Sequence, residues 1–150
     1  MACRSCQLGK IAYFNLKFVM TVIESNIALN APAASVYGFL TDLNNHRQLM
    51  PENIVDWSST QDEARFNIQN MAKLVLQVAS RNPNEIIIQA VEAPPFPLQL
   101  KWGIKEAGVQ THVLYTISAD MNMMMKMMAK GPLQKLADHE TERLQQLLAK

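Results

Sequence analysis

Apolar and polar residues alternate strictly in the second half of this chain. Leu98, Leu100 and Trp102 are separated by Gln99 and Lys101, and a period of two is typical of a strand that buries one face. Other runs are dense in β-branched and aromatic residues. Together these patterns predict seven strands, at 21–29, 54–60, 64–70, 73–80, 85–92, 98–106 and 111–120.

The connections between the predicted strands are short. Gln61-Asp62 and Ala107-Gly108 are two-residue links, and Asn82-Pro83-Asn84 is only one residue longer. Asn, Asp, Pro and Gly are typical turn residues, and tight turns join antiparallel neighbours. A proline-rich link at 93–97 is longer. Since no helix-sized spacer separates these strands, a parallel doubly wound sheet is excluded.

Two short helices are expected after the first strand. Asn30 is expected to cap the first, with Pro32 in its opening turn. Asn44 and Asn45 are expected to cap the second, which stops before Pro51. The order of elements so far is one strand, two helices and six strands.

After Asp120 the apolar residues recur with a period of about 3.6 residues, which predicts a terminal helix. Gly131 and Pro132 are expected to interrupt it early. An apolar stripe then begins at Leu133, with Glu140 in its middle, so one helix face should pack on the sheet. The stripe consists of Leu133, Leu136, Ala137, Leu144, Leu147 and Leu148.

This order of elements resembles the START-like (SRPBCC) helix-grip fold. The residues that support the resemblance are Asn30–Ala33, Phe39–Leu43, Leu49–Pro51 and Met123–Pro132. The family includes polyketide cyclase-like proteins, plant pollen allergens and lipid-transfer domains, and this chain is similar to a small bacterial member over residues 21–150. The resemblance implies an α+β fold in which a curved antiparallel sheet of about seven strands wraps around a long C-terminal helix.

The resemblance also implies a cavity between the sheet and the terminal helix. Family members hold apolar small molecules there, and some catalyse reactions, but no fixed catalytic residues transfer to this chain. For the aromatic residues, plain core packing is the alternative to lining the cavity. The residues expected to line it are Trp57, Phe66, Ile68, Phe96, Trp102, Tyr115, Met124, Met125, Met128, Leu136, Glu140 and Leu144.

Glu140 is the most informative polar residue. A carboxylate within an apolar stripe loses solvation, so it needs a partner or stays protonated. It could anchor a ligand hydroxyl or amine, or transfer a proton; a salt bridge to Arg65 or Arg81 is the alternative. Asp56 and Tyr115 are the other candidates for acid–base chemistry.

Composition and charge exclude several functions. The 14 Lys and Arg residues nearly balance 13 Asp and Glu residues, which argues against a nucleic-acid partner. His46, His112 and His139 lack metal-ligand spacing, and no glycine-rich phosphate loop occurs. No apolar run reaches the roughly 18 residues that a membrane span needs. We therefore expect a cytoplasmic protein without metal, cofactor or integral membrane segment.

Residues 1–19 differ from the rest of the chain. They contain three basic residues, no acidic residue and both cysteines, Cys3 and Cys6. A second ligand pair for zinc is absent. We expect residues 1–19 to be an extension, Met20 to be the natural start, and 21–150 to form a single domain.

Methionine is unusually frequent. Six of the ten methionines lie between Met121 and Met128, and helical spacing places Met121, Met124, Met125 and Met128 on one face. Because methionine is flexible and polarisable, the cluster either caps the core or forms an adaptable gate at the cavity mouth or a subunit contact.

Three functions remain. The first, which we favour, is non-enzymatic binding or carriage of a hydrophobic small molecule or lipid. The second is a cyclase- or dehydratase-like enzyme that uses the acid–base residues of the same cavity. The third is a homo-oligomeric interaction module, for example a homodimer.

Overall fold

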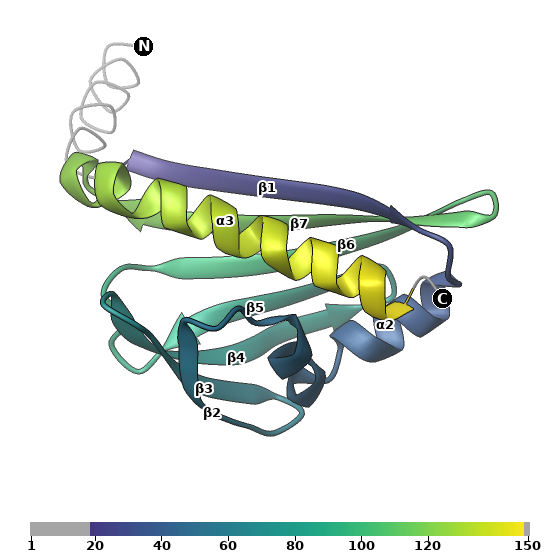
Figure 1. The fold of residues 1–150 in the computed structure, drawn as a ribbon, viewed down its shortest axis with the longest axis horizontal. Coiled ribbons are helices and arrows are strands. Elements are labelled where there is room, and N and C mark those ends of the chain that lie inside the picture. Colours follow the sequence, from purple (N-terminus) through teal and green to yellow (C-terminus); the bar gives the residue numbers. More distant parts are fainter. Residues whose placement is uncertain (1–18, 149–150) are drawn as a thin grey trace, which may run out of the picture.

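Seven antiparallel strands form a single sheet in the computed structural model, which describes residues 19–148 (Figure 1). Their order across the sheet is β1-β7-β6-β5-β4-β3-β2, which confirms the predicted antiparallel sheet. The expectations for Cys3 and Cys6 fall outside the described residues, and a start at Met20 stays a prediction. The strands are β1 (Val19–Leu29), β2 (Ile54–Ser59), β3 (Glu63–Ile68), β4 (Ala72–Asn82), β5 (Glu85–Val91), β6 (Leu98–Ala107) and β7 (Gln110–Met121).

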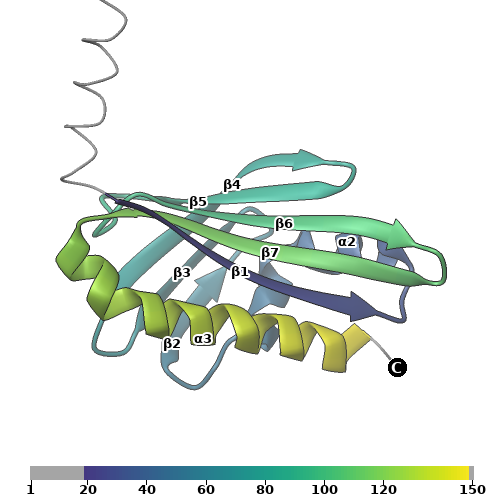
Figure 2. The same cartoon turned by 90° about the horizontal axis from the view of Figure 1, so that it is seen from above.

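The helices lie on one face of this sheet. They are α2 (Ala33–Leu40), the 3-10 helix η1 (Leu43–Leu49) and the long α3 (Met123–Leu148). Figure 2 shows α3 running along the sheet below β1 and β7, while the sheet curves so that β2 and β3 lie on the same side as α3. This arrangement is the predicted α+β helix-grip architecture.

The caps of the two short helices differ from the sequence prediction. Pro32 occupies the N-cap of α2, and no side chain caps this end. Asn30 instead accepts a hydrogen bond from Gln110 at 3.1 Å, which ties the end of β1 to β7. The cap of η1 is Asp42, whose carboxylate accepts from the Asn44 amide at 3.0 Å. A neighbouring polar residue therefore replaces the predicted cap at η1, whereas α2 begins without a side-chain cap.

The predicted interruption at Gly131 and Pro132 is wrong, because α3 is continuous through both residues. Proline removes one helical hydrogen bond and normally bends a helix. Here Ala129 and Leu133 are buried on either side of Pro132, and tertiary packing of an apolar face outweighs local propensity. Pro132 itself is exposed.

Side-chain hydrogen bonds hold α3 to the edge strand β1. The hydroxyls of Ser25 and Thr141 lie 2.8 Å apart in the buried interface. Gln134 and Gln145 donate their side-chain amides to backbone carbonyls of β1, at 3.1 Å and 3.2 Å. These bonds cover part of an edge that would otherwise offer free carbonyls to another strand.

The core lies between α3 and the concave face of the sheet. Strand positions alternate as the sequence predicts, so that Leu98, Leu100, Trp102 and Ile104 are all buried. The buried face of α3 includes Leu133, Ala137, Glu140 and Leu144. Glu140 is therefore part of the buried face, in the middle of the stripe where the sequence places it.

Candidate functional site

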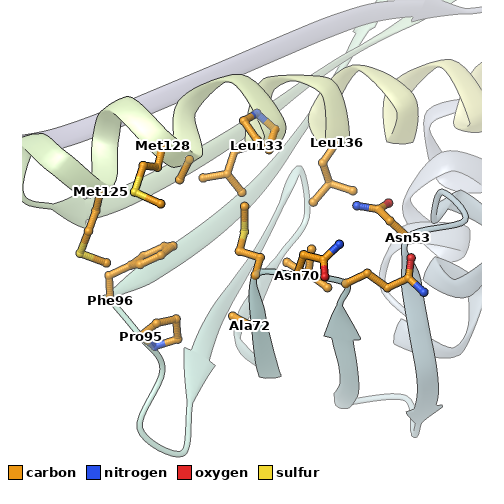
Figure 3. A pocket seen from close by; sticks show the side chains of 14 residues that line it. Asn53, Asn70, Ala72, Pro95, Phe96, Met125, Met128, Leu133 and Leu136 are labelled. Carbon is orange, nitrogen blue, oxygen red and sulfur yellow. The ribbon is translucent and has the colours of Figure 1, made fainter.

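A cavity of about 500 Å³ opens between α3 and the curled part of the sheet. Figure 3 shows Met125, Met128 and Phe96 at one end and Asn53 and Asn70 at the other. Four separate segments form the walls: the residue before β2, the first half of α3, the turn between β3 and β4 with the adjoining strand ends, and the loop between β5 and β6. The volume lies within the range of about 300–1,000 Å³ typical of small-molecule sites.

A second, smaller cavity of about 30 Å³ adjoins the first. Ile68, Leu133 and Leu136 border both spaces. The smaller space is about the volume of one water molecule. Glu140 and Tyr115 border only this second space, which we call the inner cavity.

Glu140 is 2% exposed and is hydrogen-bonded to the phenol of Tyr115. Burial raises the pKa of Glu140 to about 8, and the Tyr115 hydrogen bond opposes part of that rise. The carboxyl group is therefore mostly protonated at pH 7. Neither arginine that the sequence offered as a salt-bridge partner reaches Glu140: Arg65 pairs with Glu63 and Glu92, and Arg81 pairs with Asp62.

Tyr115 is fixed by aromatic packing. Its ring is stacked on Trp102, with ring centroids 3.8 Å apart and planes 10° apart. His46 packs edge-on against Trp102 at 5.9 Å and is hydrogen-bonded through Nε2 to the Leu40 carbonyl at 2.8 Å. Burial raises the pKa of Tyr115 well above its usual value and lowers the pKa of His46 to about 4. Both side chains are therefore neutral at pH 7.

The indole nitrogen of Trp102 differs from its neighbours. Among residues 19–148, Trp102 Nε1 is the one buried side-chain nitrogen or oxygen without a hydrogen-bond partner. Trp102 borders neither cavity, so this nitrogen is not available to a ligand in them.

Most of the residues predicted to line the cavity border one or both spaces. Four others lie elsewhere. Trp57 stacks on Phe66 with centroids 5.2 Å apart, Trp102 and Leu144 are core residues, and Met124 is 72% exposed. The predicted residues that do border a cavity are Phe66, Ile68, Phe96, Tyr115, Met125, Met128, Leu136 and Glu140.

Asp56 does not join Glu140. It lies in β2 where the register with β3 shifts between Val55 and Ser58, and its φ of 57° places it in the left-handed region. Its carboxylate accepts a hydrogen bond from Asn67 at 2.7 Å. A register shift of this kind re-aims a side chain, and Asp56 is exposed to solvent rather than directed into either cavity.

The single methionine face predicted from spacing is wrong. Met121 is the last residue of β7 and is fully buried, whereas Met124 and Met128 are each 72% exposed. The helix begins only at Met123, so Met121 does not share its helical phase. Met125 and Met128 contribute to the cavity mouth, and Met123 and Met127 lie outside it.

Several cavity residues were not predicted. Met71 and Asn70 belong to the turn between β3 and β4, Pro95 belongs to the β5–β6 loop, and Asn53 precedes β2. Such loop residues have no periodicity that marks them as facing a site. The only signal in the sequence was the proline-rich composition of residues 93–97.

Within 19–148, no three His, Cys, Asp or Glu side chains are grouped so that they could hold a metal ion. None of the helices in that range is both long enough and apolar enough to span a bilayer.

The sequence matches no protein-family model and no curated protein. Solved structures are similar in fold. A START superfamily protein from Mycobacterium smegmatis aligns with a TM-score of 0.64 and 16% identity, over 84% of this chain and 98% of that chain. At this level of identity the similarity concerns the fold.

Two further structures are enzymes or biosynthetic proteins by name. The di-domain ARO/CYC StfQ of the steffimycin biosynthetic pathway aligns with a TM-score of 0.68 and 6% identity, over 87% of this chain and 50% of that chain. Norcoclaurine synthase from Thalictrum, a point mutant with a transition-state analogue, aligns with a TM-score of 0.63 and 9% identity, over 85% and 95% of the two chains. The expected START-like helix-grip fold is confirmed.

Proposed function

From a START-like helix-grip fold with a large apolar cavity, we propose that this protein binds a hydrophobic small molecule or lipid between α3 and the sheet. The observation that carries the proposal is the cavity of about 500 Å³ with its walls of Met125, Met128, Phe96 and Leu136. Burial of apolar ligand surface contributes about 25 cal/mol per Å². The ligand is expected to enter past the two methionines.

Binding without catalysis agrees best with the residues around the cavities. Of the described residues that border either space, Glu140 and Tyr115 are the only titratable ones. A cyclase or dehydratase needs a proton acceptor as well as a donor within reach of the substrate. Asp56, the remaining candidate, faces solvent outside both cavities. The acid–base enzyme is therefore the less favoured function, and homodimerisation stays a prediction.

A saturation experiment with the uncharged dye Nile red tests the proposal. The wild-type protein is expected to bind one dye per chain, with a blue-shifted emission. Ala72 in β4 borders the cavity, so Ala72→Trp is expected to weaken binding at least tenfold by filling it. Ala79 in the same strand is exposed, and Ala79→Trp is the matched control.

The folded state of each variant is checked by circular dichroism and thermal unfolding. A folded Ala72→Trp protein that binds the dye as tightly as wild type would locate binding elsewhere. Absence of saturable binding to the wild-type protein, by this dye and by a second apolar dye, would contradict the proposed function itself.

A further inference from the structure

The inner cavity has an apolar lining except for one pair of polar side chains. Twelve residues border it, and ten of them are apolar. The two exceptions, Glu140 and Tyr115, come from different elements and are hydrogen-bonded to each other. Since the space of about 30 Å³ holds one small group, a ligand can place only its tip beside them.

The hydrogen bond between Tyr115 and Glu140 determines which hydrogen-bond donor remains for the end of the ligand that enters the inner cavity. A phenol and a carboxylic acid each have one proton to donate, and the hydrogen bond between Tyr115 and Glu140 uses one of the two. Stacking on Trp102 holds the Tyr115 ring in place. One of the two protons therefore remains for a ligand, and we place it on the Glu140 carboxylic acid.

The surroundings of Glu140 favour the neutral acid. None of the described residues that border either cavity is positively charged, and Arg65 and Arg81 form their ion pairs on the exposed part of the molecule. Burial without a cation disfavours a carboxylate, in agreement with the pKa of about 8 for Glu140. Tyr115, the only other titratable neighbour in the cavity, stays neutral over the same pH range because its pKa is raised.

We propose that the ligand presents an uncharged hydrogen-bond acceptor, a carbonyl oxygen on an apolar skeleton, to the Glu140 carboxylic acid, with Tyr115 as the residue that positions Glu140. This inference rests on the proposed function and specifies the ligand class for the same site. The apolar skeleton occupies the outer cavity, and the oxygen reaches the inner one past Leu133 and Leu136.

An ammonium group fits the same place poorly. It carries three donor hydrogens, but the inner cavity offers acceptors only at Glu140 and Tyr115. Binding would also require a buried ion pair with no further polar support, and the desolvation of two charges offsets much of their attraction. A carbonyl oxygen needs one donor, which Glu140 supplies.

Three probes of nearly equal shape test this ligand class by displacement of Nile red. They are the ketone 2-acetylnaphthalene, the hydrocarbon 2-isopropylnaphthalene and the amine 1-(2-naphthyl)ethylamine. Each is measured on wild type, Glu140→Leu, Glu140→Gln and Tyr115→Phe. Glu140→Leu removes the donor at similar volume, whereas Glu140→Gln retains an N–H donor and cannot ionise.

The ketone is expected to bind Glu140→Leu at least tenfold more weakly than wild type, while the hydrocarbon changes less than threefold. Glu140→Gln is expected to keep ketone affinity within about threefold. Tyr115→Phe is expected to weaken ketone binding by a smaller factor than Glu140→Leu, because it frees the carboxyl group without removing it. Ketone affinity for wild type is expected to fall between pH 7 and pH 9.5, and that of Glu140→Gln is expected to stay constant.

Equal losses of ketone and hydrocarbon affinity in Glu140→Leu would overturn the inference, as would tighter binding of the amine than the ketone at pH 7. If Glu140→Leu does not fold, a pH-independent ketone affinity of the wild-type protein overturns it instead. Binding of the hydrocarbon with no preference for the ketone leaves the proposed function intact, whereas failure of all three probes and the dye contradicts that function.

Discussion

Tyr115 of β7 and Glu140 of α3 are hydrogen-bonded to each other beside a cavity whose other lining residues are all apolar. Two groups that each lose hydration on burial thereby satisfy part of each other's hydrogen-bonding capacity. The same pair joins the sheet to the helix beside the inner cavity. Stability and ligand recognition should therefore both depend on the protonation of Glu140.

Replacement of Glu140 by Gln should make stability less sensitive to alkaline pH. The folded pKa of about 8 lies above the ordinary value of 4.5, so the folded state binds the extra proton between those values. The stabilisation is fully present below about pH 4.5 and is lost as pH rises through 8, at up to about 1.4 kcal/mol per pH unit. Urea unfolding of the wild type and of Glu140→Gln between pH 5 and 9 measures how the free energy of unfolding depends on pH in each protein. Parallel pH profiles for the two proteins would show that Glu140 is not the titrating group.

His46 should have the opposite effect on the acid side. Its folded pKa of about 4 lies below the ordinary value of 6.5, so the unfolded state binds the proton more readily. The stabilisation is present above pH 6.5 and is lost as pH falls through 4, about 3 kcal/mol in total. His46→Gln should be less stable at pH 7 but should lose less stability between pH 6.5 and 4. An unchanged acid dependence in this variant would assign the effect to another group.

The contributions of His46 and Glu140 oppose each other between about pH 4.5 and 6.5. The wild-type profile should therefore be flatter there than that of either variant. The double variant His46→Gln/Glu140→Gln provides the control, because it lacks both titrations and should show only the remaining pH dependence.

Replacement of Met125 and Met128 by Leu should alter ligand range more than stability. Both residues border the cavity mouth, and Leu is stiffer at nearly the same volume, so such swaps usually cost less than about 1.5 kcal/mol. The ratio of dissociation constants for a small and a large apolar dye should change at least threefold. Met123 and Met127, 58% and 82% exposed, supply the control pair. If the substitutions change the free energy of unfolding but not the ratio of dissociation constants, Met125 and Met128 do not form an adaptable gate at the cavity mouth.

Two glycines should respond differently to alanine. Gly38 in α2 has free space where a Cβ would lie and an ordinary helical backbone, so Gly38→Ala should stabilise the protein by about 0.5–1 kcal/mol. Gly131 in α3 has equal space, but it precedes Pro132, whose ring crowds a preceding Cβ in the helical region. Gly131→Ala should therefore stabilise less, as measured by thermal unfolding. Equal gains would show that the proline imposes no such restriction.

The spacing of apolar residues and the residues of the turns predicted most of the strands and the buried face of the terminal helix. The alternation from Leu98 to Ile104 places the buried face of β6, since side chains of a strand alternate between its two faces. The stripe from Leu133 to Leu144 similarly placed Glu140 within the core before any neighbour was known. Short polar turns then left an antiparallel sheet as the only arrangement for the strands between them.

Local chemistry did not predict partners across the sequence. Arg65 and Arg81 were reasonable partners for Glu140 by charge, yet both lie on the exposed part of the molecule with other acids. Asp56 was a candidate acid until the register shift of β2 left it exposed. Pro132 should have broken α3, but packing on both sides keeps the helix continuous.

The sequence by itself determined the strands, the order of elements and the place of Glu140 within an apolar stripe, because periodicity and turn chemistry act over a few residues. The helix-grip fold followed from the resemblance of that order of elements to a known family. Only the tertiary structure decided that Tyr115 is the partner of Glu140 and that the β3–β4 turn and the β5–β6 loop close a cavity against Met125 and Met128. These relationships depend on sheet curvature and on the depth at which α3 packs, which are set by the summed contacts of the whole core.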